Sequence, residues 1–301
     1  MATNRRNFLR ELVGQVARGA GELVGQALPL DPAPLDPDPS SLEWPIPGPA
    51  PARCASLDEV YELADEVGLA RHRDAVLSIC RWSLRLTAPD IGDLQPASQD
   101  SCLLEIDLAW LSALGESGLV PEDGVLRIYD DRAPEWSPAP DTLGGSPALA
   151  AGRQLEVSPE LVLPRAWSDA VGRLGLDEGE LEAWETLRHR LAELQSTVPF
   201  DTQAPQALHR VLGYPEERRG DMPLACEMLA NDVDLGGEPP AAHPRASEFE
   251  DGTSRWLLLI QLSADPLLGW SWGAAWERRY LWIHEADLAT RRFERVRTFT
   301  Q

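Results

Sequence analysis

Two segments of this sequence resemble each other closely enough to constrain the fold. LLEIDL at Leu103–Leu108 and LLLIQL at Leu257–Leu262 share four identical positions. Each is followed by a second strand-like run, Val125–Ile128 in the first unit and Tyr280–Ile283 in the second. The spacing between the strands is 23 residues from Leu103 to Leu126 and 24 residues from Leu257 to Leu281. A matched pair of strands at a matched distance predicts an internal duplication. We expect the two units to build one extended mixed sheet, with a ligand cleft between them.

Further apolar runs predict the remaining strands. Together with the repeated units, the strand-like segments are 102–108, 125–129, 155–163, 224–229, 256–262, 280–284 and 296–299. One helix interrupts them, with Asp177 and Glu180 as caps. Its apolar stripe consists of Leu181, Trp184, Leu187, Leu191 and Leu194. The predicted fold class is α+β: a single compact domain with a large mixed or antiparallel sheet, preceded by an N-terminal helical arm.

The first 55 residues differ from the rest in composition. Residues 1–28 place apolar side chains at helical spacing, which predicts an amphipathic helical arm. Residues 29–55 are rich in proline, which removes backbone donors and extends the chain, so they are interpreted as a linker. The folded body is expected over 56–301, because Ser56 and Glu59 form a capping-box pattern at its start.

The segment Asn4–Arg10 is similar to a twin-arginine export motif. An export signal also needs an uninterrupted apolar region, and charged and polar residues such as Glu11, Arg18 and Glu22 break the run that follows. We therefore expect a cytoplasmic protein, with export as the alternative. No stretch is as long and apolar as a membrane-spanning helix requires.

The net charge of −22 restricts the partners. A surface this negative repels phosphate, which argues against nucleic acid and anionic membranes as general partners. We expect the partner to be another protein, docking on the acidic body or on residues 1–28. Because the arm is net positive, it also permits weak contact with a membrane surface. The four cysteines form no C-x-x-C pair, so we expect reduced thiols, no metal site and no cofactor.

The loop from His209 to Glu227 is the strongest candidate for chemistry. It contains His209, Asp221 and Glu227, a histidine and two carboxylates that would serve as an acid–base set or bind a metal if they converged. Tyr214 in the same loop is a candidate for ligand binding. The sequence favours the structural alternative, in which Tyr214 and Asp221 stabilise an irregular loop and the neighbouring Glu216 and Glu217 are solvated.

A tryptophan-rich stretch, GWSWGAAW, supplies further ligand-binding candidates. Trp270 and Trp272 would point to the same face of a strand, and Trp276 follows shortly after. Indoles on an open face suit stacking on a sugar or a cationic group. The alternative, which the neighbouring leucines favour, is that these side chains fill the core.

Four stretches follow one another along the chain: LLEIDLAWLSALGESGLVPEDGVLRIYDD at 103–131, HRVLGYPEERRGDM at 209–222, RWLLLIQLSADPLLGWSWGAAW at 255–276 and YLWIHEADLATRRFERVRTFTQ at 280–301. Together they resemble the YwqG-like family, a bacterial domain of unknown function, over roughly 85–301. The resemblance implies a compact α+β domain with internal pseudo-symmetry and no established chemistry. The chain departs from the family pattern at Ile91–Ser101 and at Gly273-Ala274, which puts a shared family site in doubt.

Of three function classes that the sequence permits, we favour a non-catalytic binding or protein-interaction function, because an acidic body and a basic amphipathic arm occur without a recognisable catalytic motif. An acidic body is typical of inhibitors that cover basic partners, so an immunity-like role belongs to this class. A small-molecule hydrolase using the 209–227 loop and a carbohydrate or small-ligand binder using the tryptophans remain as alternatives.

Overall fold

The part of the chain from Trp44 to Gln301 forms one compact unit. The computed structural model describes residues 46–47, 54–87, 102–114, 120–138, 148–149, 155–195, 206–217, 221–237, 239–265, 268–270 and 277–301. The predicted arm over 1–28 lies outside the described residues. Within the predicted linker, Ile46–Pro47 (β1) pairs in parallel with Gln206–Ala207 (β8).

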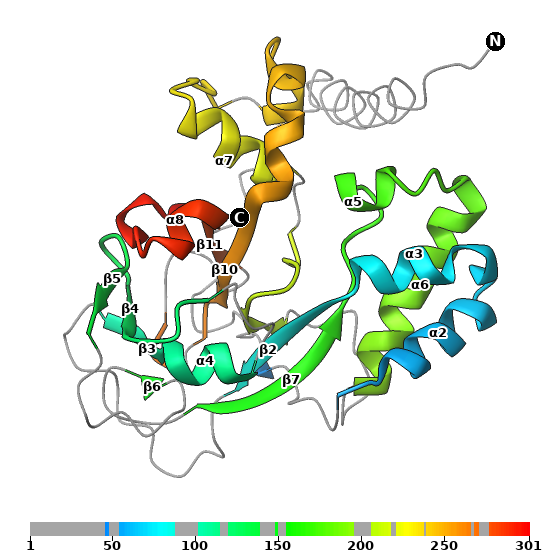
Figure 1. The fold of residues 1–301 in the computed structure, drawn as a ribbon, viewed down its shortest axis with the longest axis horizontal. Helices are drawn as coiled ribbons and strands as arrows, with labels where there is room; N and C mark the ends of the chain where they lie inside the picture. Colours follow the sequence, from blue (N-terminus) through cyan, green and yellow to red (C-terminus); the bar gives the residue numbers. More distant parts are fainter. Residues whose placement is uncertain are drawn as a thin grey trace, which may run out of the picture. The chain divides into compact units, whose positions relative to one another are not determined.

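A six-stranded sheet is the largest element of this unit. Its order is β12-β11-β10-β9-β2-β7, and every neighbouring pair is antiparallel. The strands are β2 (Arg81–Thr87), β7 (Glu156–Val162), β9 (His209–Val211), β10 (Trp256–Ser263), β11 (Arg278–His284) and β12 (Arg297–Thr300). The α+β class with a large antiparallel sheet is thereby confirmed (Figure 1).

The first of the two similar hairpins belongs to a different sheet. This second sheet has the order β5-β4-β3-β6 and is antiparallel throughout. Its strands are β3 (Cys102–Asp107), β4 (Val125–Tyr129), β5 (Glu135–Ser137) and β6 (Ala148–Leu149). The expectation that both hairpins extend one sheet is therefore wrong. The two sheets instead meet through their apolar faces, where Leu104 and Ile106 share one buried cluster with Ile260 and Leu262.

The two hairpins nevertheless occupy corresponding positions in their sheets. In the order β5-β4-β3-β6, the hairpin β3–β4 lies between two antiparallel strands, as β10–β11 does in the order β12-β11-β10-β9. The pairing register of each hairpin also shifts once, between Cys102 and Leu104 in β3 and between Leu258 and Ile260 in β10. This correspondence supports the interpretation of an internal duplication.

Three helices build a second core against β7. They are α2 (Leu57–Glu66), α3 (Arg73–Ile79) and α6 (Glu178–Gln195). The capping box of Ser56 and Glu59 is present, and Asp177 and Glu180 cap α6 through reciprocal backbone hydrogen bonds. Gln195, at the end of α6, accepts from the Leu161 N–H at 2.7 Å and donates to its carbonyl at 2.9 Å, which joins this helix to the sheet.

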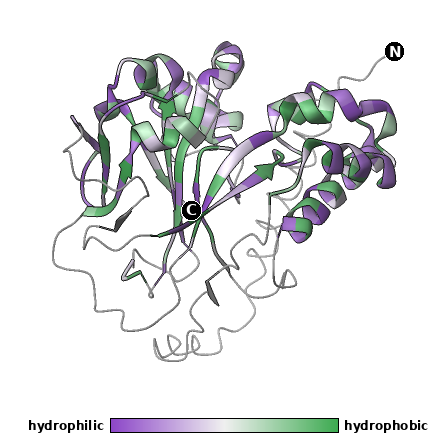
Figure 2. Cartoon of the chain, turned by 60° about the horizontal axis from the view of Figure 1, so that its bottom comes forward, coloured by the Kyte–Doolittle hydropathy of each residue, from purple (hydrophilic) through white to green (hydrophobic). Residues whose placement is uncertain are grey.

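Hydrophobic residues on these helices face the core. Trp184, Leu187 and Leu191 of the predicted stripe are buried, and Leu181 and Leu194 are partly buried against the same cluster. Figure 2 shows the helices carrying hydrophobic and hydrophilic residues side by side, as amphipathic elements do. The remaining helical segments are η2 (Ala70–His72), α4 (Leu108–Leu114), α5 (Asp169–Gly172), α7 (Met222–Ala230), η3 (Pro240–Ala242), η4 (Ala246–Glu248), η5 (Glu250–Arg255), α8 (Glu285–Ala289) and η6 (Phe293–Arg295).

The segment 224–229, predicted as a strand, lies in helix α7. Its residues are leucine, alanine, methionine, glutamate and cysteine, most of which have good helix propensity, and Pro223 occupies the first turn, where proline is tolerated. Because α7 is buried on much of its circumference, its sequence lacks a polar face and resembles a buried strand. No helix in the described part of the chain is long and apolar enough to cross a membrane.

Candidate functional site

The loop 212–217 follows β9 and is positioned by its backbone conformation. Leu212 and Gly213 both have left-handed φ angles, 60° and 75°. A Cβ atom on Gly213 would lie 2.7 Å from Ser83 Cβ and 2.7 Å from Val162 Cγ2, so the chain passes too close to β2 and β7 for any larger residue. Glycine is therefore required here, and the turn directs residues 214–217 across the face of the six-stranded sheet.

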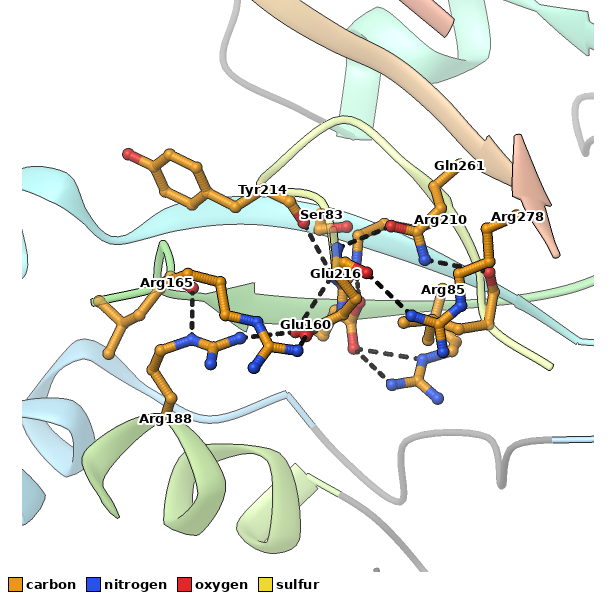
Figure 3. A network of polar contacts seen from close by, with 12 residues as sticks. Ser83, Arg85, Glu160, Arg165, Arg188, Arg210, Tyr214, Glu216, Gln261 and Arg278 are labelled. Carbon is orange, nitrogen blue, oxygen red and sulfur yellow. Dashed lines mark hydrogen bonds and ion pairs between the residues drawn. The ribbon is translucent and has the colours of Figure 1, made fainter. Parts of the chain in front are cut away.

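Buried ion pairs hold the base of this loop (Figure 3). On β7, Glu160 accepts from Arg210 Nε at 2.7 Å and from Arg85 Nε at 3.3 Å. Burial alone would raise the pKa of Glu160, but the charges of Arg210 and Arg85 outweigh it and lower that pKa. Arg210 also donates to the Tyr214 carbonyl at 2.8 Å, so the network fixes the start of the loop.

Glu216 is enclosed by arginines. Its two carboxylate oxygens accept from Arg165 Nη2 at 2.6 Å and from Arg188 Nη2 at 2.7 Å. Burial opposes ionisation of Glu216, but Arg188 and then Arg165 outweigh it and lower its pKa to about 2. The Glu216 carbonyl accepts from Arg278 Nη1 and from the Tyr280 hydroxyl, each at 2.9 Å. The expectation that Glu216 is a solvated side chain is wrong.

Glu217, the next residue, lies in an environment that favours its neutral form. Its side chain is buried, and burial, reinforced by the negative charge of Asp221, raises its pKa to about 8 against an opposing hydrogen bond from the Met222 N–H. Its Oε2 atom is buried without a hydrogen-bond partner among the described residues. Glu217 is thus a neutral carboxylic acid at pH 7, and its expected solvated state is also wrong.

Glu217 contributes to a pocket that we name the arginine–tryptophan pocket. The cavity has a volume of about 110 Å³. Its lining combines tryptophan and tyrosine faces with arginine and carboxyl groups from β2, the 164–168 segment, α5, the 212–217 loop, α7, η5, β10 and β11. The lining includes Arg81, Arg165, Trp167, Tyr214, Glu217 and Trp282, together with the exposed Ser254.

Two arginines of this pocket stack on its aromatic rings. The Arg81 guanidinium lies 4.7 Å from the centre of the Tyr214 ring, and that of Arg165 lies 5.2 Å from the Trp167 ring. Such contacts orient the guanidinium planes. Arg165 Nε is buried and has no hydrogen-bond partner in the described part of the chain. Glu217 and Arg165, each with one unsatisfied buried polar atom, therefore both line the same cavity.

The residues predicted as an acid–base set lie in three different environments. His209 is buried on β9, where its Nε2 lies 3.0 Å from Asp265 Oδ2 and its ring packs edge-on against Trp270 at 4.8 Å. Asp221 lines the arginine–tryptophan pocket at the start of α7. Glu227, on α7, accepts from Trp256 Nε1 at 2.7 Å. Of the three, the pocket includes Asp221.

The predicted ligand-binding residues also separate. Tyr214 lines the arginine–tryptophan pocket. Trp270 is 2% exposed and belongs to the core shared by the two sheets, so its indole is not available as an open platform. Trp272 and Trp276 lie outside the described residues.

Sequence reasoning missed most of the pocket. Arg81, Arg165 and Trp167 come from segments far from the 209–227 loop, and no motif connects them. Trp167 lies shortly after β7 and is 46% exposed, which is unusual for a tryptophan, but that exposure cannot be read from the sequence. The described residues contain no group of three His, Cys, Asp or Glu side chains that would hold a metal ion.

The chain therefore contains an antiparallel α+β domain with a pocket at the edge of a buried arginine–glutamate network. It belongs to a family described as a domain of unknown function (DUF1963), whose model matches residues 95–301. The matched region includes both hairpins and the loop that carries Glu216 and Glu217. Comparison with curated proteins gave no match.

Proposed function

We propose that this protein is a non-catalytic binding protein whose ligand site is the arginine–tryptophan pocket. The observation that carries the proposal is Glu217, which is buried in the pocket wall with an unpartnered carboxyl oxygen. An unsatisfied buried polar atom costs about 1–3 kcal/mol, so its presence in a native structure needs a reason. A ligand that accepts its hydrogen bond supplies one.

The composition of the pocket agrees with a binding role. Small-molecule sites are concave, largely apolar and contain a few polar groups that fix orientation. Trp256 and Trp282 form a buried apolar wall here, and Trp167 and Tyr214 are more exposed. The membership in a family of unknown function is compatible with the YwqG-like resemblance of the sequence, which stays a prediction. The hydrolase and carbohydrate-binding alternatives also stay predictions.

A fragment screen on the full chain tests the proposal. Ser254 is exposed at the rim, so Ser254→Trp would obstruct the pocket without disturbing the core. We expect fragments that raise the melting temperature of the wild type to lose that effect in Ser254→Trp. Ser78→Trp, on the exposed surface of α3, is the control and should leave the effect unchanged. Equal shifts in all three proteins would place the fragments elsewhere and refute the site.

The net charge of −22 supports a second proposal, docking of a basic protein partner on the acidic body. Docking of a protein partner through the net-positive residues 1–28 is the other route. A pull-down with the full chain and with a chain lacking residues 1–28 distinguishes the two routes. We expect a partner that docks on the body to bind both chains and to dissociate as salt is raised. A partner that is retained at high salt would contradict an electrostatic docking surface.

A further inference from the structure

We propose that the arginine–tryptophan pocket binds a small monocarboxylate with an aromatic or apolar body, held between the carboxyl group of Glu217 and the guanidinium of Arg165. This inference rests on the proposed function and adds the chemical class of the ligand.

The charges of the lining select an anion. Three arginines line the pocket, Arg81, Arg165 and Arg173, against two aspartates, Asp169 and Asp221. With Glu217 protonated, the lining side chains sum to one positive charge, and Arg165 shares the Glu216 carboxylate with the buried Arg188 outside the lining. The pocket therefore gathers guanidinium groups in a protein whose total charge is strongly negative, which favours an anionic ligand over a cation.

The unsatisfied donors select a carboxylate. Glu217 in its acid form and the Nε of Arg165 are both hydrogen-bond donors. A carboxylate has two acceptor oxygens, and hydrogen bonds to an ionised acceptor are stronger than those between neutral groups. One oxygen would accept from Glu217 Oε2–H and the other from Arg165. The remaining contacts of both residues already lie within the protein, through Met222 N–H and the Glu216 carboxylate.

The aromatic walls select the body of the ligand. Trp256 and Trp282 form the buried part of the lining, and Trp167 and Tyr214 lie toward the exposed side. Planar rings stack favourably on such surfaces. A cavity of about 150 Å³ takes up benzene in an engineered protein, so the 110 Å³ pocket has room for at most one small ring or a short apolar chain.

Near pH 8 the proton of Glu217 is the one that changes, because the groups around it keep their charge states. The charges that act on it are those of Asp221, Arg165 and Glu216, and Cys226 and Tyr280 also interact with it electrostatically. Burial raises the pKa values of Cys226 and Tyr280 above their ordinary values of 9.0 and 10.0, so both are neutral near pH 8. An ionised Glu217 would repel a carboxylate and offer it no proton. Affinity is therefore expected to fall as pH rises through about 8.

Three isosteric probes test the inference on the full chain: benzoate, benzamide and benzamidine, which are anionic, neutral and cationic. We expect calorimetry at pH 7 to give the tightest binding for benzoate. Above pH 8 its Kd should rise about tenfold for each pH unit, because one proton must be taken up for each ligand bound. Titrations in two buffers of different ionisation enthalpy should report that proton directly.

Variants of Glu217 distinguish the effect of its hydrogen-bond donor from the effect of its ionisation. Glu217→Gln keeps a donor and cannot ionise, so benzoate should bind at pH 7 and keep its affinity up to pH 9.5. Glu217→Leu removes the donor and should weaken binding at least tenfold. Glu248→Gln changes an exposed glutamate outside the pocket and should match the wild type. Unchanged benzoate affinity in Glu217→Leu, or the same pH profile in Glu217→Gln and wild type, would overturn the inference.

The three probes also distinguish failure of the carboxylate inference from failure of the proposed function. Benzamide or benzamidine binding more tightly than benzoate, with loss in Ser254→Trp, would leave the pocket as a binding site and eliminate the carboxylate. If none of the three binds at millimolar concentration to the folded wild type, and fragments do not distinguish it from Ser254→Trp, both proposals fail.

Discussion

Glu216 and Glu217 are consecutive residues with opposite electrostatic environments. The Glu216 carboxylate lies between Arg165 and Arg188, and its pKa falls to about 2. The Glu217 carboxyl is buried near Asp221, and its pKa rises to about 8. One loop therefore contains a carboxylate that anchors it to α6 and to the segment after β7, and a neutral acid that lines a pocket.

The raised pKa of Glu217 predicts a loss of stability with rising pH. Below about pH 4.5 the group is protonated in both the folded and unfolded chains. Between about 4.5 and 8 the unfolded chain loses the proton and the folded chain keeps it. Stability from this group therefore falls on the order of 1.4 kcal/mol per pH unit across that window and levels off above it.

Glu217→Gln should remove this dependence. We expect urea unfolding at pH 5, 6.5 and 8 to show that the variant gains stability relative to the wild type as pH rises. Glu248→Gln, an exposed glutamate, provides the comparison and should follow the wild-type profile. A constant difference between Glu217→Gln and wild type at all three pH values would show that Glu217 titrates normally.

Glu216→Gln should have the opposite effect. Arg188 is buried, and without the carboxylate its guanidinium retains one ionic partner, Glu185. We expect a loss of about 2–4 kcal/mol at pH 7. Because the pKa of Glu216 is lowered, its contribution is complete above pH 4.5 and disappears as pH falls toward 2. The wild type and variant should therefore converge in acid, and a penalty that persists below pH 2 would contradict the ion-pair explanation.

Local patterns in the sequence predicted much of the fold. The strands at 125–129 and 256–263 and helix α6 follow from apolar periodicity and caps, which depend on neighbouring residues alone. The pairing of the two hairpins was not predictable, because similar sequences fit either one sheet or two sheets packed face to face. Leu224–Leu229 was misassigned, because an apolar run without a polar face does not reveal its period.

The site was less predictable than the fold, because it depends on contacts between distant segments. The sequence singled out a loop that lines the pocket, and two of its candidates, Tyr214 for ligand binding and Asp221 for catalysis, are among the lining residues. Its emphasis on His209 followed from residue type, whereas that side chain is buried beside Asp265. Glu217 was overlooked, because nothing local distinguishes a buried glutamate from a solvated one.

Trp270 is predicted to be a core residue that stabilises the shared interior. It is 2% exposed and packs against His209, so Trp270→Ala should cost about 3–5 kcal/mol through lost burial and an internal cavity. Trp82→Ala is the matched control, since Trp82 is 43% exposed, and should cost about 1 kcal/mol or less. Urea unfolding measures both, and similar small losses would show that Trp270 is not packed as described.

Gly213 is predicted to be the residue that allows the loop to reach its position. Gly213→Ala combines an unfavourable left-handed φ with contacts of 2.7 Å to side chains of β2 and β7, so we expect a loss of about 2–4 kcal/mol. Gly68→Ala separates the two causes, because Gly68 has a φ of 91° and no atom within 4 Å of the added Cβ. It should show the backbone cost alone, about 1–2 kcal/mol. Since the clash pushes residues 214–217 away from the sheet, Gly213→Ala should also weaken benzoate binding, whereas Gly68→Ala should not. Equal effects of the two substitutions on stability and binding would mean that close packing of the loop against β2 and β7 does not position the pocket.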